Sequence, residues 1–183
     1  MSLNELYGVC GEAGAYGIAN HETVLPSSRV TLTEETAPMI RSFFQVEQPQ
    51  QKLFTPIPRS VHVLWLIDCA GAVHLALEEM VDNEGTLLGV LAKAAAAQPP
   101  KGFKKLGHPT LLSEGEVMAR IAGEIYYDPE ADKSGSGKLW CLTNDSGRYG
   151  LREGQTREHL EAACRYFEKF HLYFSTRYTK PRA

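Results

Sequence analysis

Two apolar arms joined by a short turn constrain the fold more than any other part of the sequence. They lie in VHVLWLIDCAGAVHLALEE, residues 61–79, where DCAG separates the arms. Alternation of this kind around a short turn is typical of a β-hairpin. Because both faces of the first arm are largely apolar, we expect this arm to be a central strand of a sheet. Its two faces carry Val61, Val63, Trp65 and Ile67 on one side and His62, Leu64 and Leu66 on the other.

A second hairpin is predicted over residues 119–144. Its strands are ARIAGEIYYD and KLWCLTND, and the polar segment PEADKSGSG between them is expected to form an exposed tip. Period-two spacing puts Arg120 and Glu124 on one face of the first strand and its isoleucines on the other. Gly123 is expected to let another backbone segment approach closely, because it has no side chain.

Three segments are predicted to be helical. TREHLEAACRYFEKFHL places Leu160 and Phe167 along one face, with Thr156 as the N-terminal cap. TLTEETAPMIRSFFQV is expected to begin its helix near Thr36, since Pro38 is tolerated only in a first turn. GTLLGVLAKAAAAQPP is helical by propensity and is ended by its two prolines.

YFSTRYT, residues 173–179, is expected to be a terminal strand. Hairpins with helices between and after them predict an α+β fold, with a mainly antiparallel sheet built from two hairpins and helices packed on it. The length favours a single domain. We expect an irregular lead-in over 1–30, a helix and connector over 31–58, and the sheet-and-helix core over 60–183.

Composition and charge limit the function classes. A formal net charge of -3 and a pI of about 6.1 do not indicate the broad basic surface of a protein that binds duplex nucleic acid. The first residues lack the basic and apolar regions of a signal peptide, and the apolar runs are shorter than the roughly 20 residues that cross a bilayer. We therefore expect a soluble protein without a membrane partner, cytoplasmic as synthesised, with secretion as an effector left open.

The four cysteines are widely spaced and include no C-x-x-C pair: Cys10, Cys69, Cys141 and Cys164. This spacing lacks a zinc signature and the cysteine density of a secreted disulfide scaffold. A free buried thiol behaves as a small hydrophobic side chain. The sequence therefore predicts four reduced cysteines with a structural role, and no metal site.

The loop LTNDSGRYG, residues 142–150, contains more chemistry than a hairpin exit needs. Asn144 and Ser146 can form local turns with the backbone. Arg148 beside Tyr149 suits the binding of a phosphate or carboxylate. The alternative is plain turn chemistry, with a surface arginine stacked on a tyrosine. If the loop binds an anion, Arg148→Ala should remove binding and leave the melting temperature nearly unchanged.

A histidine outside any apolar period is the second candidate. His108 lies between Gly107 and Pro109, which hold the backbone extended and present the imidazole at the start of an element. If Glu124 points inward near Asn144 and His108, the fold has a polar cluster. The alternatives are a histidine that only shapes a turn, and a solvated ion pair between Arg120 and Glu124.

A resemblance covers roughly residues 102–172, at GHPTLL, ARIAGEIYYD, GKLWCLTNDSGRYG and HLEAACRYF. There the sequence resembles a set of bacterial proteins of unknown function, some of which resemble toxin or effector domains, and also the C-terminal half of plant IQ-motif calmodulin-binding proteins. The shared pattern is H-x-x-L…A-G-E…N-x-S-G-x-Y. The plant proteins have His-Ser-Ser and Ser-Gly-His-Tyr segments at these places; here Pro109 and Thr110 replace the two serines, and Arg148 replaces the second histidine. The resemblance implies a common core around these motifs and no established activity; without an IQ helix it does not imply calmodulin binding.

Two classes of function stay open. As an enzyme, the chain would use a cleft for a nucleotide-like substrate, and we favour ADP-ribosyl transfer with NAD as the substrate, ahead of a metal-independent RNase. As a binding module, it would use the loop as a structural lock and bind a protein partner elsewhere. The candidate catalytic residues are His108, Glu124 and Tyr149, and the candidate substrate-binding residues are Arg120, Asn144, Ser146 and Arg148.

Overall fold

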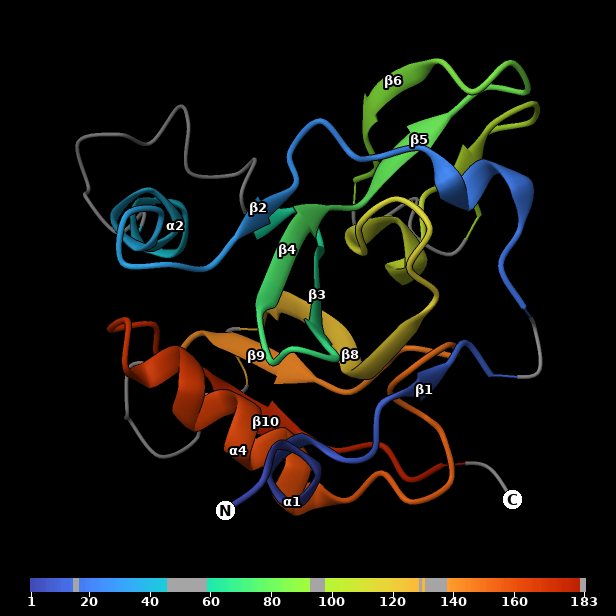
Figure 1. Ribbon diagram of the computed structural model, residues 1–183. Coiled ribbons are helices and arrows are strands. Elements are labelled where there is room, and N and C mark those ends of the chain that lie inside the picture. Colours follow the sequence, from blue (N-terminus) through green and yellow to red (C-terminus); the bar gives the residue numbers. More distant parts are fainter. Residues whose placement is uncertain (15–16, 46–58, 93–97, 129, 131–137, 182–183) are drawn as a thin grey trace.

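The computed structural model describes residues 1–14, 17–45, 59–92, 98–128, 130 and 138–181 (Figure 1). Within these ranges, no helix is both long and apolar enough to span a membrane. The elements are α1 (Leu3–Tyr7), β1 (Gly11–Glu12), the 3₁₀ helix η1 (Asn20–Thr23), β2 (Val30–Thr31), α2 (Ala37–Phe44), β3 (Val63–Asp68), β4 (Val73–Leu77), β5 (Glu79–Val81), β6 (Leu87–Val90), β7 (Lys104–Lys105), the 3₁₀ helix η4 (His108–Leu111), β8 (Met118–Tyr127), β9 (Trp140–Thr143), α4 (Arg157–Glu168) and β10 (Ser175–Arg177).

The main sheet has the strand order β10-β9-β8-β3-β4-β2, and β1 adds to β8. The two predicted hairpins are confirmed as β3–β4 and β8–β9, and β3 also pairs antiparallel with β8. Strand β3 is therefore central, as its two apolar faces predicted. The terminal strand β10 is also confirmed, although it runs parallel to β9. The fold is α+β with a mostly antiparallel sheet and packed helices.

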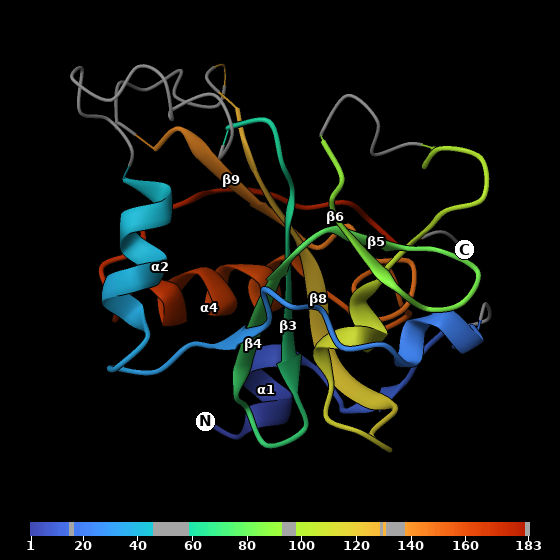
Figure 2. The same ribbon diagram turned by 90° about the horizontal axis from the view of Figure 1, so that it is seen from above.

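The two faces of the sheet are covered by different parts of the chain (Figures 1 and 2). Alternation along β3 sends Val63, Trp65 and Ile67 into a core with α1, α2 and α4. The intervening Leu64 and Leu66 point to the opposite face, where they pack against the η4 segment and the loop after β9. The second face, away from the helices, is where the polar candidates lie.

Helix α4 packs on the first face as its pattern predicted. Leu160 and Phe167 are fully buried, and the ring of Phe167 meets the ring of Trp65 edge-on at 6.0 Å between centroids. Thr156 occupies the cap position, and its backbone N–H donates to Nδ1 of His159 at 3.2 Å. Helix α2 also begins where predicted, with Thr36 at its cap position and a proline in the first turn.

The helix predicted over residues 85–100 is wrong where the structure describes it. Residues 87–90 form strand β6, which pairs with β5 in a small sheet that also contains β7. Gly89 has a φ of 119°, which excludes an α-helix at that residue. The short run Leu-Leu-Gly-Val fits either period, and the turn that precedes it favours the strand: Oδ1 of Asp82 accepts hydrogen bonds from two backbone N–H groups of that turn. Residues 93–97, and all of the predicted tip over 129–137 except Glu130, lie outside the described residues.

The N-terminal lead-in is more regular than predicted, since it contains α1, β1, η1 and β2. A capping box stabilises α1: Ser2 Oγ accepts from the backbone N–H of Glu5, and Oε2 of Glu5 accepts from the backbone N–H of Ser2 at 2.6 Å. Ser-x-x-Glu is a recognisable helix start, so this element could have been predicted from the sequence.

The prediction of four reduced cysteines is wrong for two of them. Cys10 and Cys69 form a disulfide, with 5.3 Å between their Cα atoms. Cys141 and Cys164 are free and buried, as predicted. The sequence separation of 59 between Cys10 and Cys69 hid their proximity, because only the tertiary fold brings the N-terminal segment beside the β3–β4 turn.

Gly123 lies where two backbone segments are in contact, as its place on the strand predicted. A Cβ at this position would overlap the carbonyl oxygen of Thr143 and lie 2.8 Å from the Cα of Asn144. The carbonyl of Thr143 also accepts a hydrogen bond from the indole nitrogen of Trp65 at 3.0 Å. Gly123 therefore lets the end of β9 cross β8 closely, which brings the loop after β9 onto the second face.

Candidate functional site

A cleft of about 530 Å³ opens on the second face of the sheet. It is bounded by η1, β3, the end of β4, the segment from β7 to η4, β8 and the loop after β9, so it collects side chains from six separate parts of the chain. Its carboxyl groups belong to Glu22, Glu78, Glu124 and Asp145, its cations are Lys105 and Arg148, and His108, Ser146, Gly147, Gly107 and Leu64 complete the lining.

The sheet positions Glu124 on the floor of this cleft. Glu124 lies opposite Leu64 in the β3–β8 pairing, on the face away from the helices. Its Oε2 is 2.8 Å from Nδ1 of His62, and its side chain is 23% exposed. Burial alone would raise the pKa of Glu124, but the hydrogen bond from His62 and the positive charge of Lys105 act against burial, and the pKa is lowered. Glu124 is therefore a carboxylate at neutral pH.

Glu78 has the opposite electrostatic environment. It follows β4 and is almost fully buried, and its Oε1 is 3.1 Å from Nζ of Lys105. Burial raises the pKa of Glu78; the charge of Lys105 acts against this, while the charge of Glu124 adds to it. The cleft thus contains two carboxyl groups whose pKa values are displaced in opposite directions, a pattern typical of acid–base sites.

The η4 segment presents the imidazole of His108. Nε2 of His108 lies 2.9 Å from the carbonyl oxygen of Gly123. Because a carbonyl only accepts, Nε2 carries the hydrogen and the lone pair of the neutral ring is on Nδ1. Burial lowers the pKa of His108, and the negative charge of Glu124 opposes that effect only in part. His108 is therefore a neutral histidine beside an ionised carboxylate.

The depressed pKa of His108 predicts a pH-dependent stability. Its folded pKa lies below the ordinary value of 6.5, so the unfolded chain takes up a proton first as the pH falls. The free energy of unfolding should then decrease from about pH 6.5 downward, by at most about 1.4 kcal/mol per pH unit from this group. Urea denaturation at several pH values between about 7 and 5 measures this slope.

The variant His108→Gln should have a flatter stability profile over that range, because glutamine does not titrate and can still donate to the carbonyl of Gly123. His21→Gln, in the 3₁₀ helix η1, controls for the loss of a histidine elsewhere. Equal slopes for the wild type and His108→Gln would contradict a buried neutral imidazole.

Arg148 reaches across the cleft to the N-terminal part of the chain. Its Nη2 lies 2.8 Å from Oε2 of Glu22, which is 6% exposed. The same oxygen accepts from the backbone N–H of Ala19 at 2.7 Å. An Arg148→Ala variant would leave the buried carboxylate without this cation, so the expectation of an unchanged melting temperature does not hold.

We predict that Arg148→Ala lowers the free energy of unfolding by about 1–3 kcal/mol, the usual cost of leaving a buried polar group without its partner. Adding Glu22→Gln to Arg148→Ala should recover part of this loss, because the unpaired charge is removed. Urea midpoints of the two single variants and the double variant give the coupling energy between these residues. Additive losses would show that the contact does not contribute to stability.

The loop after β9 has two roles, divided along its length. Asn144 is fully buried and fastens the loop: its Nδ2 donates to the carbonyls of Gly150 (2.9 Å) and Thr179 (2.8 Å), and its Oδ1 accepts from the N–H of Thr179 (2.8 Å). Gly150 lies so close to Asn144 that a Cβ there would overlap the Asn144 carbonyl oxygen. The middle of the loop, residues 145–148, borders the cleft.

Besides Asn144, which fastens the loop and does not line the cleft, two further predicted site residues lie apart from it. Tyr149 is fully buried among the apolar side chains of the second face, with Leu64 and Leu66, and its hydroxyl donates to the carbonyl of Val117 at 3.0 Å. Arg120 donates to the carbonyl of Cys69 and to Oδ1 of Asn4, and makes no ion pair with Glu124. Neither residue is part of the cleft lining, whereas His108, Glu124, Ser146 and Arg148 meet there.

Three cleft residues were missed by the sequence analysis: Glu22, Glu78 and Lys105. For Glu78 a signal existed, because a charged residue directly after a buried strand is often held by tertiary contacts. For Glu22 and Lys105 no local pattern pointed to the cleft. Among the described residues, no group of three His, Cys, Asp or Glu side chains is arranged to hold a metal ion.

No model of a known protein family, no curated protein and no solved structure matches this chain. The resemblance noted at GHPTLL and NDSGRYG stays a prediction, and what is proposed below depends on the residues of the cleft.

Proposed function

We propose that the cleft binds NAD and that the chain transfers its ADP-ribosyl group to an acceptor. The observation that carries this proposal is the ionised, partly buried Glu124 beside the neutral His108 in a cleft with more carboxyl groups than cations. A fixed, partly buried carboxylate stabilises positive charge that develops during a reaction. The nicotinamide ring of NAD is already positive, and this suits it to a carboxylate-rich site.

In the proposed reaction, the bond between the ribose C1 and the nicotinamide nitrogen breaks, and its electron pair leaves with nicotinamide. Positive charge then develops on the ribosyl carbon and ring oxygen, where the carboxylate of Glu124 stabilises it. A nucleophilic atom of the acceptor forms the new bond to C1 and loses its proton. Nδ1 of His108 is the lone-pair nitrogen that takes this proton.

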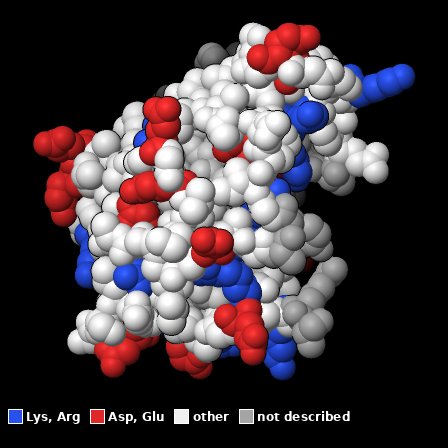
Figure 3. Space-filling view, turned by 45° about the vertical axis from the view of Figure 1, so that its right-hand side comes forward, with Lys and Arg blue, Asp and Glu red and all other residues white. Residues whose placement is uncertain are grey.

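Ribonuclease activity receives less support from the cleft. An RNA phosphate needs cations, and both cations of the cleft are paired with glutamates: Arg148 with Glu22 and Lys105 with Glu78. On the face drawn in Figure 3, the Lys and Arg side chains of the described residues lie among Asp and Glu side chains. An RNA chain carries one phosphate per nucleotide and would have to displace carboxylates along its length, whereas NAD brings a single diphosphate together with its positive ring.

The role of the loop as a structural lock is compatible with the enzyme proposal. The hydrogen bonds of Asn144 fasten both ends of the loop, which leaves residues 145–148 to face the cleft. The acceptor in the transfer is the natural place for a protein partner. If the chain acts as an effector after export, the disulfide between Cys10 and Cys69 suits that route, since disulfides persist in oxidising compartments.

The test is to incubate the full chain with NAD and to measure the release of nicotinamide by chromatography. Without an added acceptor protein, water accepts the ADP-ribosyl group. We expect slow release with the wild type, and faster consumption of NAD when a suitable acceptor protein is added. A parallel incubation with short single-stranded RNA tests the ribonuclease alternative. The absence of nicotinamide release, together with the absence of NAD binding in calorimetry, would overturn the proposal.

A further inference from the structure

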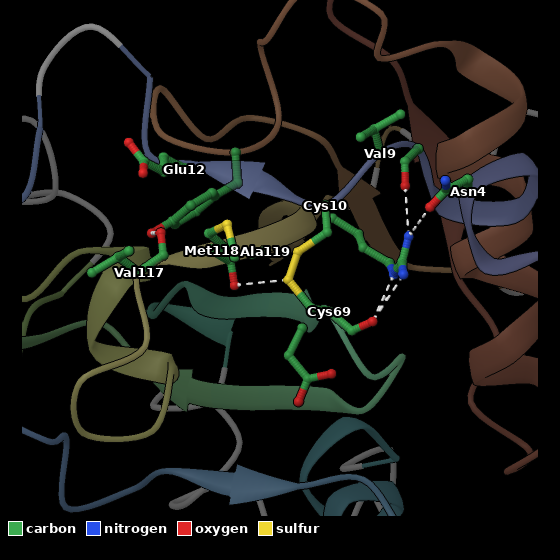
Figure 4. The surroundings of a disulfide bond; sticks show 12 residues. Asn4, Val9, Cys10, Glu12, Cys69, Val117, Met118 and Ala119 are labelled. Carbon is green, nitrogen blue, oxygen red and sulfur yellow. Dashed lines mark hydrogen bonds between the residues drawn. A yellow bond between two sulfur atoms is a disulfide. The ribbon is translucent and has the colours of Figure 1, made fainter.

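A disulfide fixes the N-terminal segment beside the turn between β3 and β4 (Figure 4). Cys10 lies between α1 and β1, and Cys69 lies in the turn that follows β3. Both residues are partly exposed, whereas Cys141 and Cys164 are buried. A small reductant therefore has access to the bonded pair, whereas the two free thiols are shielded from solvent.

The segment held by Cys10 runs along the loop that borders the cleft. The backbone N–H of Gly14 donates to the carbonyl of Arg148 at 2.9 Å. From the other end of the loop, Arg152 donates to the carbonyls of Glu12 (3.1 Å) and Val9 (3.3 Å). Residues 9–14 therefore support the backbone of the loop from outside the cleft. The same N-terminal part of the chain supplies Glu22, the partner of Arg148 inside the cleft.

Other contacts join the same two parts of the chain without the disulfide. The guanidinium of Arg120 donates to the carbonyl of Cys69 (2.9 Å), to Oδ1 of Asn4 (2.6 Å) and to the carbonyl of Gly8 (3.1 Å). Figure 4 shows Asn4 close to Cys10 and Cys69. Breaking the sulfur–sulfur bond would leave this arginine in place, so reduction should loosen the segment and not unfold the protein.

We propose that the Cys10–Cys69 disulfide is a redox switch that controls the order of the cleft loop. A dithiol or two molecules of a monothiol such as glutathione supply two electrons and two protons, the sulfur–sulfur bond breaks, and two cysteine thiols form while the reductant becomes a disulfide. Residues 9–14 then move more freely, and the loop at 146–152 loses its outer support. The cleft is held in its ligand-binding form under oxidising conditions.

Hydrogen–deuterium exchange measured by mass spectrometry tests this proposal without any ligand. After reduction, the peptides that cover residues 9–14 and 146–151 should exchange roughly tenfold faster or more, as local opening becomes easier. The peptide of α4, residues 157–168, should keep its protection. Reoxidation should restore the slow exchange. The double variant Cys10→Ser/Cys69→Ser is the matched control, and should behave like the reduced wild type whether or not reductant is present.

Three results would overturn the switch. The first is the absence of a linked Cys10–Cys69 peptide in the oxidised protein. The second is unchanged exchange over 146–151 after reduction. The third is an equal increase in α4, which would indicate general destabilisation. Because no outcome depends on NAD, the switch and the proposed activity can fail independently of each other.

Discussion

Phe167→Ala should lower the free energy of unfolding by about 3–5 kcal/mol, the usual cost of removing a buried aromatic ring. The ring is fully buried on α4. It meets Trp65 of the central strand at 6.0 Å and Phe174 at 5.4 Å, both edge-on. Alanine at position 167 would leave a cavity between the helix and the sheet, because the rings of Trp65 and Phe174 are closely packed and cannot move far to fill it.

Urea denaturation measures this effect as a shift of the midpoint. Tyr173→Ala is the matched control, because that aromatic side chain is 54% exposed. Tyr173→Ala should change the free energy of unfolding by no more than about 0.5 kcal/mol. A midpoint of Phe167→Ala equal to that of the wild type would contradict the packing of α4 on the sheet.

Glu124→Gln should reduce the rate of nicotinamide release by about 100-fold or more, because a fixed negative charge near the developing cation is lost. Glutamine keeps the shape of the side chain and can still hydrogen-bond to Nδ1 of His62. The melting temperature should therefore change far less than the rate. Substrate affinity should also change less than turnover, since the carboxylate acts mainly on the transition state.

Glu34→Gln is the control for this substitution, since Glu34 is exposed and lies outside the cleft. Its rate should equal that of the wild type. If Glu124→Gln keeps the full rate of release, Glu124 is not the stabilising carboxylate. If it loses folding and activity together, its interaction with His62 is structural.

The elements that could be predicted from the sequence are those with a long and regular pattern. The two hairpins, the cap of α4 at Thr156 and the start of α2 near Thr36 all follow from side-chain period and capping chemistry. Strand β6 was missed because Leu-Leu-Gly-Val is too short for a period to decide between helix and strand. There the pairing with β5 determines the structure.

The site could be predicted only in part, because it is assembled from six segments of the chain. His108 and the NDSGRYG loop were recognisable as unusual local chemistry. The sequence did not show which residues of the loop line the cleft and which hold the loop in place. Asn144 and Tyr149 are held by hydrogen bonds to Thr179 and Val117, which are distant in sequence. The same reason applies to Glu22, which reaches Arg148 only in the folded chain.

We propose that the cleft around Glu124 and Arg148 is the ligand-binding site. Backbone amide chemical shifts of the oxidised, ¹⁵N-labelled protein test this proposal when the protein is titrated with an NAD analogue whose nicotinamide ribose is replaced by a carbocycle. We expect the largest shifts at Gly107, His108, Gly147 and Arg148, which surround the cleft. Shifts confined to another surface, such as the apolar groove between α2 and the sheet at Met39 and Leu77, or no shifts at a saturating concentration of the analogue, would contradict it.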